Sequence, residues 1–140
     1  MEEDVVPPRA APLASVLLAE DDPDIRDLFA MALEGAGAAV TAVADGSQAL
    51  AALEDATFDL LVTDMWMPKV SGLDLCKRLR ADPALRELPV LMVSAYGRLR
   101  GREEAMLVGA TEYVQKPLRP SQLVSKVDAM LGGRLVARGA

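Results

Sequence analysis

The chain of 140 residues is 51% hydrophobic and 26% charged, which suits one globular domain and leaves too little length for two typical ones. Its formal net charge of −6 argues against a free-standing nucleic-acid binder, and the absence of histidine excludes Ser-His-Asp or Cys-His catalysis, histidine metal sites and an internal phosphohistidine donor. A single cysteine, no membrane-length apolar run and an acidic beginning predict a cytoplasmic protein without an internal disulfide.

The first elements lead from a proline-containing segment into a strand and a helix. Residues 1–14 hold three prolines among small and charged residues, which predicts a flexible lead-in. The apolar run 16–19 predicts a strand that ends at three acids, residues 20–22. An Asp-Pro pair at 22 and 23 is typical of a helix start, and glycines at 35 and 37 are typical of its end.

Two further strands and helices follow. Residues 39–43 predict a second, weaker strand, and residues 47–55 predict a short helix. The next strand, 60–63, is apolar except for one threonine, as in strands buried on both faces, and it delivers the carboxylate of Asp64 at its end. A third helix is expected to begin after Ser71, a capping residue, and to end near the Asp-Pro pair at 82 and 83.

The last third of the chain repeats the alternation. Residues 90–93 predict a strand that ends at Ser94. The fourth helix is expected to be short and comparatively mobile, because glycines and a run of charges weaken its first turn. A fifth strand over 112–115 ends at Lys116-Pro117, and a last helix runs from about Pro120 to the glycines at 132 and 133.

Five strands alternating with five helices predict an α/β fold with a parallel sheet covered on both faces. The domain is expected to span residues 15–131, with a short tail over 132–140. Ligands of such sheets bind at the carboxyl ends of the strands. The polar residues at or just after these ends are Glu20, Asp21, Asp64, Ser94 and Lys116. The pattern therefore predicts that they meet at one edge of the sheet.

These residue types together suit phosphoryl chemistry. Three neighbouring carboxylates repel one another and raise each other's pKa unless a cation holds them. An all-oxygen set favours Mg²⁺ or Mn²⁺. Lys116 adds a fixed positive charge, and Ser94 adds a hydroxyl donor. An oxygen of Asp64 could then attack a phosphoryl group in line, which would give an aspartyl phosphate.

Each feature alone has a simpler structural interpretation. Asp64 can end a strand and begin a turn. The acids at 20–22 can form a solvated loop with a helix cap, and Lys116-Pro117 can be a turn, with or without a cis peptide bond. Their shared position, each at the end of a strand, is what favours a common site.

On these residues the sequence resembles a receiver domain of the two-component response-regulator family, over about residues 15–131. The matching stretches are Val16–Pro23, Asp64–Pro68 with Ser71-Gly72, Ser94-Ala95 and Lys116-Pro117. The resemblance implies a flavodoxin-like, doubly wound sheet of five parallel strands in the order 2-1-3-4-5, flanked by five helices.

The resemblance also implies roles for individual residues. Asp64 would accept a phosphoryl group from a sensor histidine kinase or a histidine phosphotransfer protein. The chain would be a switch that assists only its own phosphorylation and dephosphorylation, rather than an enzyme. The ligands of Mg²⁺ would be Glu20, Asp21, Asp64 and the backbone carbonyl of Trp66. Ser94 and Lys116 would contact the phosphoryl oxygens, and Tyr113 falls at the family's switch aromatic, which turns inward as Ser94 moves.

The sequence departs from the family pattern at three positions. Glu20 replaces the commoner Asp of the acidic pair, which is expected to alter the geometry or the affinity of the metal site. Trp66 and Tyr96 fall at variable positions that border the phosphoryl group. Their bulk is expected to restrict the approach of water, which predicts slow dephosphorylation.

Phosphorylation is expected to shift the surface formed by the fourth helix, the fifth strand and the fifth helix. In the family this surface binds partners or a second copy of the chain, so an effector or output domain and a phosphorylation-dependent homodimer are expected. These residues carry no DNA-binding element, and neither direct nucleic-acid binding nor membrane binding is expected.

Three other functions stay open at this point. A phosphatase similar to haloacid dehalogenases would also use a strand-end Asp with Mg²⁺, but it would place a second Asp where this chain has Trp66. A flavodoxin-like ligand binder would place a Gly/Ser/Thr-rich loop after the first strand, where this chain has acids. A receiver fold that binds partners without phosphorylation remains, although the acceptor, the acidic pair and Lys116 are all present.

Overall fold

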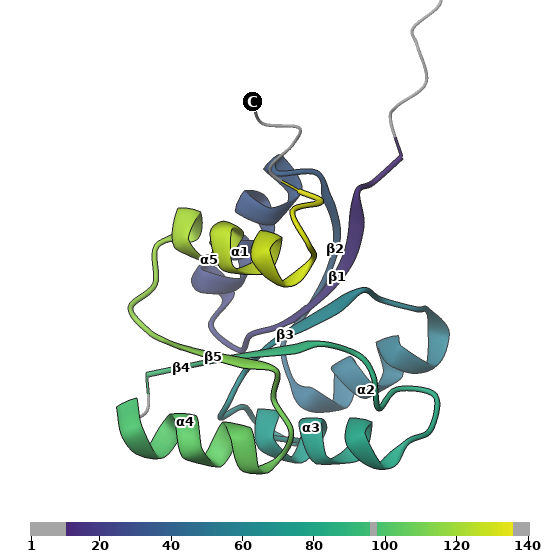
Figure 1. Cartoon of the computed structure of the whole chain (residues 1–140), viewed down its shortest axis with the longest axis vertical. Coiled ribbons are helices and arrows are strands. Elements are labelled where there is room, and N and C mark those ends of the chain that lie inside the picture. Colours follow the sequence, from purple (N-terminus) through teal and green to yellow (C-terminus); the bar gives the residue numbers. More distant parts are fainter. Residues whose placement is uncertain (1–10, 96–97, 136–140) are drawn as a thin grey trace, which may run out of the picture.

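The computed structural model describes residues 11–95 and 98–135, and strands and helices alternate through them (Figure 1). The elements are β1 (Ala14–Ala19), α1 (Pro23–Gly35), β2 (Ala38–Val43), α2 (Gly46–Asp55), β3 (Leu60–Asp64), α3 (Gly72–Ala81), β4 (Val90–Ser94), α4 (Arg98–Leu107), β5 (Glu112–Gln115) and α5 (Pro120–Met130). The strands are parallel and lie in the order β2-β1-β3-β4-β5. The predicted doubly wound α/β fold is confirmed.

The helices form one layer on each face of the sheet. In Figure 1, α1 and α5 lie together on one side of the sheet, and α2, α3 and α4 lie on the other. Alternate residues of β3 point to opposite layers, so Leu61 packs in the core beneath α2, α3 and α4, whereas Leu60 and Val62 pack beneath α1 and α5. A strand buried on both faces explains the nearly continuous apolar run in the sequence.

The strand register brings the polar strand ends to one edge of the sheet. Opposite one another on neighbouring strands lie Ala19 and Thr63, Asp64 and Val93, and Ser94 and Gln115. Residues that follow β1, β3, β4 and β5 therefore leave the sheet at nearly the same level.

Three helices, α1, α3 and α5, begin where the sequence predicts. Asp22 caps α1 by accepting hydrogen bonds from the backbone N–H groups of Asp24 and Ile25, and Ser71 caps α3. The helix α4 has ten residues, as do α2 and α3, so its expected shortness does not set it apart. None of the helices within residues 11–95 and 98–135 has the length and apolar character of a membrane span.

The two ends of the described chain pack against each other. The guanidinium of Arg134 donates a hydrogen bond of 2.8 Å to the carbonyl of Leu13 and lies 3.6 Å from a carboxylate oxygen of Asp59. Leu135 is buried in the core beneath α1 and α5. The core therefore includes Leu135, and Leu13 packs against the same core.

Candidate functional site

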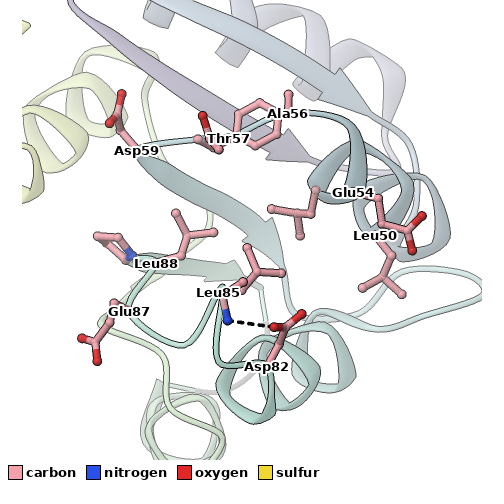
Figure 2. A pocket seen from close by; sticks show the side chains of 13 residues that line it. Leu50, Glu54, Ala56, Thr57, Asp59, Asp82, Leu85, Glu87 and Leu88 are labelled. Carbon is pink, nitrogen blue, oxygen red and sulfur yellow. Dashed lines mark hydrogen bonds between the residues drawn. The ribbon is translucent and has the colours of Figure 1, made fainter.

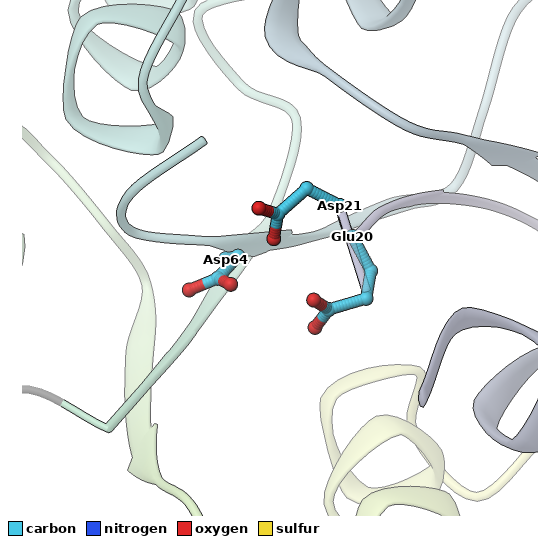
Figure 3. A group of neighbouring side chains, drawn as sticks. All are labelled: Glu20, Asp21 and Asp64. Atoms are coloured by element: carbon cyan, nitrogen blue, oxygen red, sulfur yellow. The ribbon is translucent and has the colours of Figure 1, made fainter. Parts of the chain in front are cut away.

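Three carboxylates meet at the carboxyl edge of the sheet. Glu20 and Asp21 follow β1, and Asp64 ends the adjacent strand β3. One oxygen of each lies within 4.8 Å of the others, and Figure 3 shows the three side chains gathered around one point. Glu20 is buried, Asp64 is half-buried and Asp21 is exposed, so the cluster opens to solvent on one side.

Lys116 joins this cluster from the end of β5. Its ammonium donates a hydrogen bond of 2.8 Å to Glu20 Oε1 and one of 3.2 Å to Asp64 Oδ2. The backbone N–H of Lys116 also donates to the carbonyl of Ser94 at 2.9 Å, which ties the ends of β4 and β5 together. The Lys116–Pro117 peptide bond is cis, one of the two forms that the sequence left open.

The burial of these groups shifts their pKa values. Burial raises the pKa of Glu20 and of Asp64, although Lys116 opposes the rise in each. Burial would lower the pKa of Lys116, but its hydrogen bond to Glu20 and the charge of Asp64 outweigh this, so its pKa is raised and the ammonium form is favoured. The cluster carries more negative charge than one ammonium offsets, and a divalent cation would lower its energy.

The loop that carries the acidic pair is fixed from within. The backbone N–H of Asp22 donates to Glu20 Oε2 at 3.1 Å, and the guanidinium of Arg26 on α1 donates to the Glu20 carbonyl at 2.9 Å. Arg26 is not predicted from the sequence, because an arginine six residues after Glu20 in a helix gives no recognisable pattern. Its position explains how Glu20 is held beside Lys116.

The backbone around Asp64 is held by the start of α3. The N–H of Gly72 donates to the carbonyl of Met65 at 2.9 Å. A Cβ atom added to Gly72 would lie 2.0 Å from the Asp64 carbonyl oxygen, so only glycine allows α3 to approach this closely. The backbone N–H of Trp66 hydrogen-bonds the Asp64 carboxylate, and the Trp66 side chain is 50% exposed. The backbone of Trp66 therefore borders the Asp64 carboxylate.

The two predicted switch residues are both buried. Ser94 ends β4 and is 2% exposed, and Tyr113 on β5 is also 2% exposed. The Tyr113 ring packs in the core beneath α2, α3 and α4. Burial raises the pKa of its phenol, against the opposing charge of Arg102. Tyr96, predicted to border the site, lies outside the described residues.

A separate cleft of about 610 Å³ lies at the opposite end of the sheet. It is formed by α2, by the loop before β3 and by the loop before β4, and Figure 2 shows Leu50, Leu85 and Leu88 directed into it. None of the predicted site residues lines this cleft. Glu20, Asp21 and Asp64 instead lie at the carboxyl edge of the sheet, which is called the acidic edge below.

Comparison with known proteins identifies the family to which this fold and this cluster of carboxylates belong. The response regulator receiver domain family matches residues 16–128. The DNA-binding dual master transcriptional regulator RpaA of Synechocystis sp. is 35% identical over 116 residues, which are 83% of this chain and 48% of that protein. This chain spans about half the length of several curated regulators that it matches.

Solved structures agree in fold. The chemotaxis response regulator CheY4 of Vibrio cholerae is 32% identical, with a TM-score of 0.79 over 84% of this chain and 98% of that chain. The receiver domain of the sensor histidine kinase PA1611 of Pseudomonas aeruginosa, solved with a magnesium ion coordinated in its active site cleft, is 28% identical, with a TM-score of 0.79 over 88% and 99%. Strand order, acidic edge and family match coincide, and the chain belongs to the response regulator receiver domain family of two-component systems.

Proposed function

We propose that this receiver domain acts by accepting a phosphoryl group on Asp64. The observation that carries the proposal is the Lys116 ammonium, which contacts Asp64 at 3.2 Å and Glu20 at 2.8 Å beside a third carboxylate. A fixed ammonium beside the acceptor can balance the charge of an incoming phosphoryl group. A strand-end turn without this chemistry would not need a lysine from a strand two places away in the sheet.

The phosphoryl donor is a phosphohistidine on a sensor histidine kinase or a histidine phosphotransfer protein, since the chain has no histidine of its own. An oxygen of Asp64 forms the new bond to phosphorus as the bond from phosphorus to the donor nitrogen breaks, and the electron pair stays on the imidazole. Lys116 holds the transferred group in place. The domain turns over no separate substrate and assists only its own phosphorylation and dephosphorylation.

The acidic edge fits Mg²⁺, with Mn²⁺ as a substitute. Its three carboxylates offer only oxygen ligands within 4.8 Å of one another, and we assign the backbone carbonyl of Trp66 as a further ligand. The magnesium-bound receiver domain of the Pseudomonas aeruginosa kinase supports this assignment. Bound Mg²⁺ would neutralise charge on the phosphoryl oxygens while Asp64 attacks.

The output surface consists of α4, β5 and α5. Ser94 and Lys116 would respond to the new charge on Asp64, and Tyr113 would carry the change to α4. Among the described side chains of α4, two large apolar ones are exposed, Met106 at 39% and Leu107 at 84%. They suit contact with an effector, an output domain or a second copy of the phosphorylated domain. We place this switch in the cytoplasm, where a sensor kinase would present its phosphohistidine.

The experiment is incubation with Mg²⁺ and a small phosphodonor such as acetyl phosphate, followed by intact-mass spectrometry and peptide mapping. The native chain should gain one phosphoryl group at Asp64, and chelation of the metal should abolish the gain. Asp64→Asn should not be modified, whereas Asp59→Asn, at the other end of the same strand, should behave as the native chain does. Modification elsewhere, or none with any donor, would overturn the proposal.

A further inference from the structure

Tyr113 packs against one turn of α4 that is shaped to receive it. A Cβ atom added to Gly101 would lie 2.2 Å from the Tyr113 hydroxyl oxygen and 2.8 Å from the ring carbon that carries it. Real Cβ contacts essentially never come this close, so any side chain at position 101 would displace either the ring or the helix. Gly101 is itself buried, and its missing side chain leaves the space that the phenol fills.

The next residue, Arg102, holds the same tyrosine from the outer side. Its guanidinium carbon lies 5.5 Å from the centre of the Tyr113 ring, which is the geometry of a cation–π contact. One guanidinium nitrogen also donates a hydrogen bond of 3.3 Å to the Tyr113 carbonyl. One arginine therefore contacts both the ring and the backbone of Tyr113, although its own side chain is exposed.

Tyr113 is connected to the acidic edge through β5. It lies three residues before Lys116, whose ammonium contacts Asp64 and whose backbone N–H is hydrogen-bonded to Ser94. A change in the position of the Tyr113 ring would therefore act on β5, the strand that positions Lys116. A two-state element that contacts two sites in this way can couple them, and the coupling free energy is the same in both directions.

We propose that Gly101 and Arg102 form a socket on α4 that holds Tyr113 buried, and that Arg102 acts as a positioning residue that sets how readily Asp64 becomes phosphorylated. The second half of this proposal rests on the proposed function of Asp64. Loss of the Arg102 contacts loosens Tyr113 and disfavours the phosphorylated state.

The test compares Arg102→Ala with Arg100→Ala in the full chain. Both remove one exposed arginine from α4, but residues two apart in a helix point in different directions. The accessibility of Tyr113 is followed by nitration and peptide mass spectrometry, and the phosphorylated fraction is measured at steady state with acetyl phosphate. Arg102→Ala should raise the nitration rate by roughly 3- to 30-fold, the factor that one cation–π contact supports. The phosphorylated fraction should fall, and Arg102→Lys should restore part of both.

A second experiment tests the contact with Gly101 by a change of sign. Gly101→Ala should lower the urea midpoint in the native chain, because its methyl group meets the Tyr113 ring. In a Tyr113→Leu background it should raise the midpoint, because leucine lacks the hydroxyl oxygen and the two ring carbons that the methyl would meet, and because alanine is the better helix former. A raised midpoint in both backgrounds would overturn the socket.

The outcomes separate this inference from the function beneath it. If the native chain is phosphorylated at Asp64 while Arg102→Ala and Arg100→Ala behave alike in both assays, the inference fails alone. If the native chain is never phosphorylated, the proposed function fails, whereas nitration and the Gly101→Ala sign change still decide whether the socket exists.

Discussion

Gly72→Ala should shift the backbone of Asp64 without changing any side chain of the acidic edge. The added methyl group would lie 2.0 Å from the Asp64 carbonyl oxygen, 2.9 Å from the Asp64 carbonyl carbon and 3.0 Å from the Met65 Cα. All three are backbone atoms of β3 and of the loop that follows it, so no flexible side chain can move aside. Either α3 or the end of β3 has to shift.

The size of the effect follows from two opposing contributions. Overpacking a tight contact costs about 1–3 kcal/mol, whereas replacing glycine by alanine in a helix contributes up to about 1 kcal/mol. The gain is small here because Gly72 is the first residue of α3. We therefore expect a net loss of about 1–2 kcal/mol in the free energy of unfolding, or roughly 3–8 °C in Tm, together with slower phosphorylation of Asp64.

Gly35→Ala is the matched control, because Gly35 ends α1 and nothing lies within 4 Å of a Cβ added there. Its free energy of unfolding should stay the same or rise by up to about 1 kcal/mol. Urea denaturation and phosphorylation with acetyl phosphate measure both variants. Gly72→Ala behaving like Gly35→Ala in both assays would refute the reasoning, since the contact with the Asp64 backbone would then carry no strain.

Three further predictions concern the site and the core. Trp66→Asn should shorten the lifetime of the phosphorylated form by roughly tenfold, equal to about 1.4 kcal/mol of barrier, because the bulk of the side chain at position 66 is expected to restrict the approach of water to Asp64; an unchanged or longer lifetime contradicts this. Mg²⁺ at ten times its Kd should stabilise the native chain by about 1.4 kcal/mol, and Asp64→Asn should lose most of this gain. Without metal, Asp64→Asn should be at least as stable as the native chain, because burial penalises the charged carboxylate of Asp64. Burial raises the pKa of Cys76 above 9.0, so the native state keeps a proton that the unfolded state releases. Its contribution to stability should therefore decline by at most about 1.4 kcal/mol per pH unit as the pH rises past that value. Urea titrations at pH 8 and 9.5 on the native chain and Cys76→Ala check this. An equal change in the free energy of unfolding between the two pH values in both proteins would contradict it.

The sequence was most informative where local chemistry and strand order agree. The apolar strands, the caps at Asp22 and Ser71 and the alternation of elements predicted the sheet, and the sheet order then brought Glu20 and Asp64 together. These features are readable because each depends on a few consecutive residues and on the general rule that parallel strand ends share an edge.

The sequence was least informative about contacts between distant elements. Arg26 and Arg102 each donate a hydrogen bond to a backbone carbonyl. Arg26 reaches from α1 back to the loop after β1, and Arg102 reaches from α4 to β5. The glycine that admits Tyr113 was interpreted only as a weakness of α4, because a missing side chain gives no sign of what occupies its space. The packing of Leu135 depends likewise on three-dimensional neighbours.

The hydrogen bond between Arg134 and Leu13 has a practical consequence for rearranging the chain. It holds the start of β1 beside the segment after α5, so a short linker can join residues near Leu13 to residues near Leu135, and a new opening can be made in the exposed loop between α3 and β4. Such a circular permutant should keep its acidic edge intact and still respond to acetyl phosphate. Its new ends would lie beside the amino ends of β3 and β4, so reporters fused there would be at the opposite end of the sheet from the acidic edge and would leave that edge uncovered.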